Sequence, residues 1–133
     1  MVIPFSYRVI YGDTDQMGVM YYANYLRLFE AGRCEYMHVK GCPYSEVEGR
    51  GVLLPISEAH VNYIKPALFD QTITVHTKVE LVKGARVNFT YEVTNEDGEL
   101  LATGFTKHAA LDAERRVIRV PADLVDLLEP EKS

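Results

Sequence analysis

Cysteine is scarce in this chain of 133 residues, which contains only Cys34 and Cys42. Two cysteines provide neither a disulfide framework nor the paired spacing of a structural zinc site. His60, His76 and His108 also lack the spacing of metal ligands. The sequence therefore predicts no metal site.

Basic residues are outnumbered as well, because 14 Lys and Arg face 19 Asp and Glu, for a net charge of −5. This balance argues against a nucleic-acid-binding surface as the main function, although a net negative charge is compatible with local basic patches. No run approaches the ~18 consecutive apolar residues of a membrane-spanning helix. The N-terminus lacks the basic segment, apolar run and cleavage site of a signal peptide. We expect a cytoplasmic protein without a membrane span.

The composition is that of a globular protein, with 47% hydrophobic and 25% charged residues. A chain of this length commonly forms one domain, which predicts a single domain over residues 1–133. It opens with a strand over Ile3 to Tyr11, followed by a helix from about Tyr22 to Val39. The helix face has the spacing i, i+3, i+4, i+7, and consists of Tyr25, Leu28, Phe29, Gly32 and Tyr36. Leu26, Cys34 and Met37 widen this apolar face, which predicts a deeply buried helix.

Strands dominate the second half of the chain. Five strands are expected, within residues 53–64, 73–81, 87–93, 100–111 and 116–120. One short helical turn is expected before them, within 43–51, and a terminal helix after them, over 121–128. Asp97-Gly98 is a strong signal for a tight hairpin turn, and the imperfect alternation after Leu100 indicates a bulge. The tight turns require antiparallel pairing. The expected fold class is α+β, with one antiparallel sheet around a long central helix and with exposed edges that favour a dimer.

The segment from Tyr11 to Tyr25 connects the first strand to the helix and contains Asp13, Asp15 and Gly18. A helix start offers free backbone N–H groups and the positive end of the helix dipole. A carboxylate beside these donors is either a cap or part of an active site, and the residue pattern alone leaves both open.

The pattern Asp-Thr-Asp-x-x-Gly-Val-x-Tyr-x-x-Asn-Tyr over residues 13–25 resembles the hotdog-fold acyl-CoA thioesterases. The similarity extends to Tyr-Leu-Arg-Leu-Phe-Glu-Ala-Gly-Arg on the helix and to Pro-Ala-Leu-Phe-Asp at 66–70. The nearest branches are the 4-hydroxybenzoyl-CoA thioesterases and the Tol–Pal-associated thioesterases, and the 1,4-dihydroxy-2-naphthoyl-CoA thioesterases are similar too. Many Tol–Pal-type members have His where this chain has Tyr22, whereas the hydroxybenzoyl branch resembles it with Tyr.

The resemblance implies that Asp15 is the catalytic carboxylate, as nucleophile or general base, and that the backbone N–H of Tyr22 stabilises the oxyanion. It also implies active sites at the interface of a homodimer, often within a homotetramer. Substrate-binding positions are then Gly18, Val19, Met20 and Tyr25. The implied substrate is a short-chain or aromatic acyl-CoA, and acyl carrier protein is another possible partner. Coenzyme A is part of this substrate, so no separate cofactor is expected. For the coenzyme A phosphates the first candidates are Lys83 and Arg86, followed by Lys65, Lys107, Arg115 and Arg116.

Other interpretations compete with this one. Asp13 is expected to order the loop as a hydrogen-bond acceptor. Cys34 and His38, at i and i+4 and expected inside the buried helix, are interpreted as packing residues and not as a nucleophile–base pair. At the level of function, the alternatives are a hotdog hydratase, for which no His stands between Asp15 and the helix, and a non-catalytic module that binds acyl-CoA or acyl carrier protein.

Overall fold

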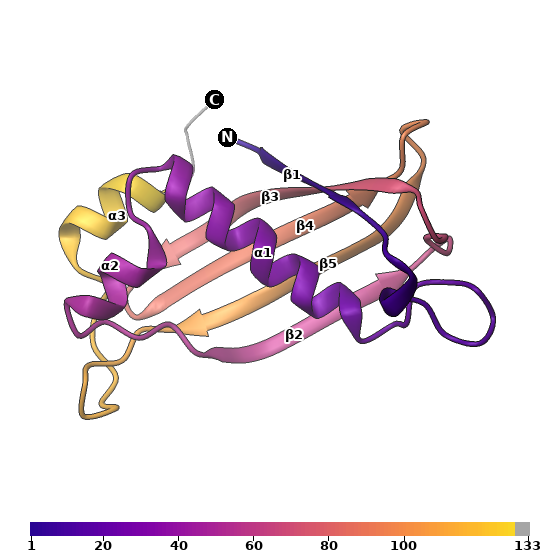
Figure 1. Cartoon of the computed structure of the whole chain (residues 1–133). Coiled ribbons are helices and arrows are strands. Elements are labelled where there is room, and N and C mark those ends of the chain that lie inside the picture. Colours follow the sequence, from indigo (N-terminus) through magenta and orange to yellow (C-terminus); the bar gives the residue numbers. More distant parts are fainter. Residues whose placement is uncertain (130–133) are drawn as a thin grey trace.

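A computed structural model describes residues 1–129 and shows one sheet with a long helix lying across it (Figure 1). The strands are β1 (Ile3–Arg8), β2 (Ile56–Tyr63), β3 (Thr72–Lys83), β4 (Arg86–Thr94) and β5 (Leu100–Ala109), in the spatial order β1-β3-β4-β5-β2. Every neighbouring pair is antiparallel. The helices are α1 (Asn24–Val39), α2 (Tyr44–Gly49) and α3 (Ala122–Leu128), and a 3-10 turn spans Tyr11–Asp13. The α+β class with an antiparallel sheet around a central helix is thereby confirmed.

The face of α1 that packs on the sheet is the one that the sequence predicts. Tyr25, Leu28, Phe29, Gly32 and Tyr36 are all buried, together with Met37. The Phe29 ring stacks on Tyr91 of β4, with 4.2 Å between ring centroids. The predicted wider face is wrong at Leu26 and Cys34, which are exposed because they lie on the side of α1 turned away from the sheet.

Two glycines allow α1 to approach the sheet closely. A Cβ on Gly32 would lie 2.6 Å from Thr77 Oγ1, and a Cβ on Gly104 would lie 2.5 Å from Cε2 of Phe29. These distances leave no room for a larger residue at the centre of the helix–sheet contact. The position of α1, and therefore of its first turn, depends on both glycines.

The β-hairpins also follow the sequence. Gly98 adopts a positive φ of 79° in the turn between β4 and β5, where the Asn95 side chain accepts hydrogen bonds from the Asp97 and Glu99 N–H groups. The predicted bulge is present, because Val93 pairs with Ala102 whereas Thr94 pairs with Leu100. Leu101 is the additional residue, and it is buried like the Ala102 that follows it.

Some boundaries differ from the prediction. Residues 116–120 form no strand, since Val117 makes only an isolated bridge to Leu111. The strand expected from Leu53 begins at Ile56, because Pro55 has no N–H to donate to the sheet. The predicted helical turn is α2 and the predicted terminal helix is α3, while residues 130–133 of the expected domain lie outside the described residues.

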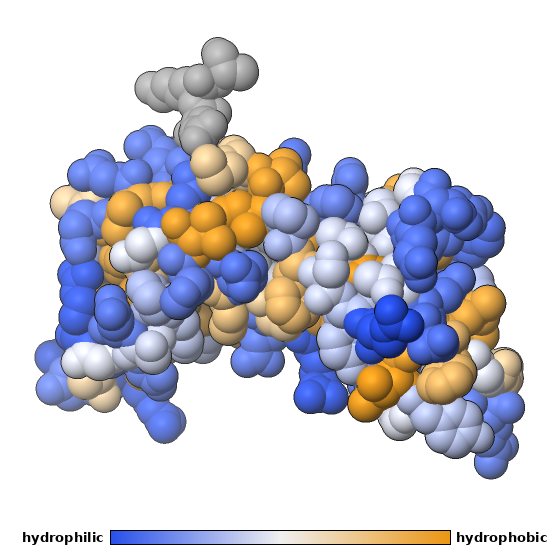
Figure 2. All heavy atoms as spheres, turned by 45° about the horizontal axis from the view of Figure 1, so that its top comes forward, coloured by the Kyte–Doolittle hydropathy of each residue, from blue (hydrophilic) through white to orange (hydrophobic). Residues whose placement is uncertain are grey.

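The two edges of the sheet are unlike each other. The edge strand β1 carries Pro4, a residue that blunts an exposed edge. The edge strand β2 has no proline and is exposed along nearly its whole length, with Ile56 and Tyr63 among the exposed apolar residues. Apolar side chains also reach the surface as separate patches on the face shown in Figure 2. No helix within residues 1–129 is long and apolar enough to cross a membrane.

Candidate active site

The loop between β1 and α1 is anchored by Asp13, which is only 6% exposed. Its Oδ2 atom accepts hydrogen bonds from the Tyr7 hydroxyl at 2.8 Å and from the Ile10 N–H at 2.9 Å. The hydrogen bond to the Asp13 carboxylate, together with burial, raises the pKa of Tyr7. These contacts agree with the predicted role of Asp13 as a loop-ordering acceptor.

Asp15 lies at the base of a small turn that Gly18 makes possible. The Asp15 N–H donates to Val19 O at 2.9 Å, and the Gly18 N–H donates to Asp15 O at 3.0 Å. Gly18 has a φ of 79°, in the left-handed region that favours glycine. The Asp15 Oδ1 atom accepts the Met17 N–H at 2.8 Å, which orients the carboxylate and leaves lone pairs of both oxygens available.

The first turn of α1 has no side-chain cap. Asn24 N–H donates to Tyr21 O at 3.0 Å and Tyr25 N–H donates to Tyr22 O at 3.3 Å, so the helical hydrogen bonds begin there. Within residues 1–129, the N–H groups of Tyr22 and Ala23 have no hydrogen-bond acceptor. Two free donors therefore remain at the positive end of the helix dipole.

Asp15 and the helix start border one cleft of about 280 Å³. Val19, Met20, Tyr22 and Tyr25 line it with Asp15, and the opposite wall is formed by Tyr63, Ile64, Lys65 and Pro66. Gly18 shapes the loop but is not part of the lining. The sequence did not indicate Tyr63, Ile64 or Pro66, which follow about 40 residues after the loop.

Aromatic rings determine the shape of this cleft. The Tyr63 ring lies edge-on to Tyr25 and Tyr22, with centroid distances of 5.3 and 6.4 Å. The Tyr63 hydroxyl donates to Tyr22 O at 3.0 Å, which fixes the end of β2 against the helix start. Burial raises the pKa of both Tyr25 and Tyr63, so these hydroxyls stay protonated near neutral pH.

Comparison with known proteins identifies the family of this chain. The family profile of the thioesterase-like superfamily matches residues 9–128, which is most of the chain. This chain belongs to the thioesterase-like superfamily. Membership of this family and the hotdog fold, both predicted from the sequence, are confirmed.

Three relatives illustrate the family. A putative acyl-CoA thioesterase, YneP, of Bacillus subtilis is 38% identical over 106 residues, which cover 80% of this chain and 77% of YneP. The structure of a DHNA-CoA thioesterase from Staphylococcus aureus is 31% identical, with a TM-score of 0.90 over 95% of this chain and 87% of that one. A mutant 4-hydroxybenzoyl-CoA thioesterase in complex with 4-hydroxybenzoyl-CoA has a TM-score of 0.87 over 96% of this chain and 99% of that one. At 23% identity, this last likeness supports the fold alone.

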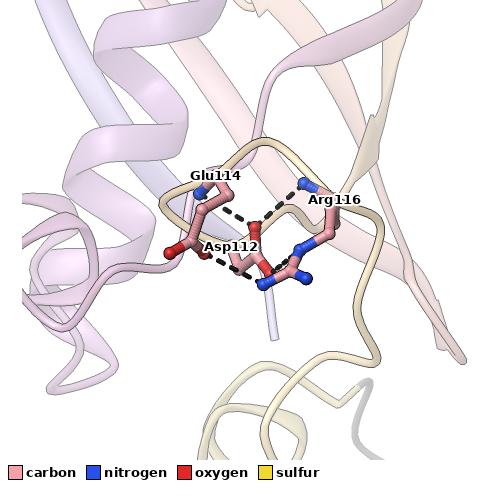
Figure 3. Close-up of polar contacts among 3 residues, drawn as sticks. All are labelled: Asp112, Glu114 and Arg116. Atoms are coloured by element: carbon pink, nitrogen blue, oxygen red, sulfur yellow. Dashed lines mark hydrogen bonds and ion pairs between the residues drawn. The ribbon is translucent and has the colours of Figure 1, made fainter.

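The basic residues of this family member are distributed over both ends of the molecule. Lys65 lines the cleft and forms an ion pair with Glu99. Lys83 and Arg86 face each other in the turn between β3 and β4, at the end of the sheet opposite the cleft (Figure 1). Arg116 pairs with Asp112 and Glu114 in a loop after β5 (Figure 3). Within one chain, Lys65 is therefore the candidate that the fold brings to the cleft.

A second cavity of about 360 Å³ lies along α1, and its lining includes Arg33, Cys34 and His108. Cys34 and His38 are exposed, which corrects the expectation that both lie inside the buried helix face. Desolvation raises the pKa of the Cys34 thiol, opposite to what a nucleophile requires. The contacts thus give no support to a nucleophile–base pair at these positions.

His108 is the buried polar group beside this cavity. Its Nδ1 atom lies 2.8 Å from Leu54 O and its Nε2 atom 2.8 Å from Thr106 Oγ1. Burial lowers the pKa of His108 to about 4, so the ring is neutral near pH 7. Since a carbonyl only accepts, Nδ1 carries the proton, and Nε2 accepts from the Thr106 hydroxyl.

Proposed function

We propose that this protein hydrolyses the thioester bond of an acyl-CoA. The observation that carries the proposal is one cleft lined by both Asp15 and Tyr22, the latter with a free N–H group at the start of α1. The family assignment supports it, as do the names of the B. subtilis and S. aureus relatives, which are an acyl-CoA and a DHNA-CoA thioesterase.

The free N–H groups of Tyr22 and Ala23 would stabilise the oxyanion that forms when the thioester carbonyl is attacked. One such preorganised donor typically contributes about 3–4 kcal/mol to the transition state. The thiolate of coenzyme A is a good leaving group, so a single carboxylate suffices for the rest of the reaction.

Asp15 has two possible roles in this scheme. As a nucleophile, a carboxylate oxygen attacks the carbonyl carbon, the C–S bond breaks, and water hydrolyses the resulting mixed anhydride. As a general base, Asp15 removes a proton from a water that attacks the carbonyl carbon directly. The bond from Met17 N–H to Oδ1 leaves lone pairs for either role.

The acyl group that fits best is short or aromatic. Tyr22, Tyr25 and Tyr63 line a cleft of only about 280 Å³, which suits a flat ring or a few carbon atoms better than a long chain. Met20 contributes a flexible apolar side chain to the same wall. The thioester can be presented on coenzyme A or on an acyl carrier protein, since both bear the same pantetheine thiol.

A homodimer is part of the proposal, and it rests on the exposed β2 edge. Antiparallel pairing of β2 with its copy would place the start of one β2 beside the Tyr63 end of the other. The copy's Lys83 and Arg86 would then lie at the same end of the assembly as the Asp15 cleft, where coenzyme A phosphates need cations. Lys65 would contribute from the same chain.

The test is a thiol-release assay over a panel of acyl-CoA and acyl carrier protein thioesters, with Asp15→Asn and Asp15→Ala beside the wild type. We expect near-complete loss of turnover in both variants, with unchanged circular dichroism spectra. Wild-type turnover in both would remove Asp15 from the mechanism.

The same panel separates the alternative functions. A hydratase would act on enoyl-CoA without releasing thiol, and a binding module would bind acyl-CoA without turnover. Within residues 1–129 no histidine lines the cleft, which supports hydrolysis over hydration.

A further inference from the structure

Asp13 is a buried carboxylate that the proposed chemistry leaves unused. It lies two residues before Asp15 but does not line the cleft. Its backbone and side chain together make five hydrogen bonds, which reach three parts of the molecule. A buried acid with this many partners has a role beyond filling space.

The side chain of Asp13 connects the loop to β1. Both side-chain bonds, from the Tyr7 hydroxyl of β1 and from the Ile10 N–H, end on the same oxygen, Oδ2. The Asp13 N–H in turn donates to Ile10 O at 3.0 Å. Asp13 is therefore fixed to the strand before the chain reaches Asp15.

The carbonyl of Asp13 connects the same loop to α1. It accepts the Tyr21 N–H at 2.8 Å and the Asn24 Nδ2 donor at 2.9 Å, which fills both lone pairs of the oxygen. Tyr22 and Ala23, whose N–H groups are free, lie between these two attachment points. Asn24 is of a residue type that often caps helices, but here its side chain holds the first turn to the loop instead.

We propose that Asp13 and Asn24 are the positioning residues of this site and that they act by geometry and not by charge. This inference rests on the proposed function, in which the free N–H groups of Tyr22 and Ala23 stabilise the oxyanion. Asp13 connects the loop that contains Asp15 to the helical turn that contains the two free N–H groups, so the loop and the turn form one unit. The distance between carboxylate and donors is then set before substrate arrives, which is what efficient catalysis of acyl transfer requires.

The use of a single carboxylate oxygen makes the proposal testable. The amide oxygen of an Asn at position 13 can accept both bonds that Oδ2 accepts, so Asp13→Asn removes the charge and keeps the attachment. Asp13→Ala removes both side-chain bonds. Asn24→Ala removes only the side-chain bond from the first turn to Asp13 O, at a partly exposed position.

The experiment measures kcat and KM for the best acyl-CoA of the panel in Asp13→Asn, Asp13→Ala and Asn24→Ala. We expect Asp13→Asn to stay within about 3-fold of wild type, and its pH–rate profile to be unchanged. Asp13→Ala and Asn24→Ala should lose about 10- to 100-fold in kcat with little change in KM, the cost of a displacement of about 1 Å. Asp123→Ala, which breaks an ion pair with Arg50 remote from the cleft of the same chain, is the matched control and should keep kcat.

Two results would overturn the inference. An Asp13→Asn variant as inactive as Asp15→Asn would show that the charge of Asp13 takes part in the chemistry. A wild-type kcat in Asn24→Ala would show that the attachment does not position the donors, and this variant decides the matter even where Asp13→Ala does not fold. If the wild-type protein releases no thiol from any member of the panel, the proposed function fails instead, so the two failures are distinguishable.

Discussion

The neutral His108 makes the stability of this protein depend on pH in a calculable way. Its ring is 2% exposed and lies between Leu54 O and the Thr106 hydroxyl. Burial lowers its pKa from 6.5 to about 4 in the folded chain, whereas the unfolded chain retains the ordinary value. Between these two values the unfolded chain binds a proton that the folded chain does not.

Stability therefore falls as the pH falls from 6.5 towards 4. Each unit of pKa difference corresponds to about 1.4 kcal/mol, so the complete effect is about 3 kcal/mol, of which about 2 kcal/mol is lost by pH 5. The pKa values of Asp112, Asp123 and Glu99 are also lowered, in these cases by hydrogen-bond partners.

The measurement is urea unfolding at pH 7.5 and pH 5 for wild type and His108→Asn. The asparagine amide can still donate to Leu54 O but does not titrate. We expect the free energy of unfolding to fall about 2 kcal/mol further in wild type than in the variant between these pH values. Because the other histidines are present in both proteins, their contributions cancel. An equal pH dependence in the two proteins would refute the assignment of a buried neutral ring.

Two further substitutions test the packing of α1 on the sheet. Gly104→Ala would place a Cβ 2.4 Å from His60 O, a backbone atom that cannot move aside easily. We therefore expect the free energy of unfolding in urea to fall by about 1–3 kcal/mol or more. A free energy of unfolding equal to that of wild type would contradict the close approach. Tyr91→Phe removes a hydroxyl that accepts from Arg33 at 3.2 Å and lies 2.6 Å from Thr106 Oγ1. We expect a loss of about 1–3 kcal/mol in thermal unfolding with the fold retained, and an unchanged midpoint would mean that this buried contact contributes nothing.

Local patterns in the sequence determine much of this fold and part of the site. The spacing of Tyr25, Leu28 and Phe29 identifies the buried face of α1, and Asp97-Gly98 identifies a hairpin. The motif around Asp15 predicts which loop residues border the cleft because they are close together in the chain. These features depend on neighbours within a few residues.

What the sequence did not provide depends on long-range contacts. Tyr63 and Pro66 reach the cleft only because β2 ends beside the start of α1. Residues 116–120 have strand-like side chains, but their contacts with Ala110, Leu111 and Gly84 are isolated hydrogen bonds and one bridge, not the continuous ladder of a strand. Cys34 has the helical position of an apolar residue, yet the sheet does not extend to that side of α1.

The uncapped start of α1 has a consequence for anyone who wishes to make this protein more heat-resistant. Ala23, the N-cap residue of α1, stands where designers would normally insert Ser or Asp. An Asp there would place a negative charge beside the Tyr22 and Ala23 N–H groups, where the oxyanion of the reacting thioester is proposed to form. The helix would gain stability, whereas the added charge would oppose the negative charge that the proposed reaction develops at the helix start.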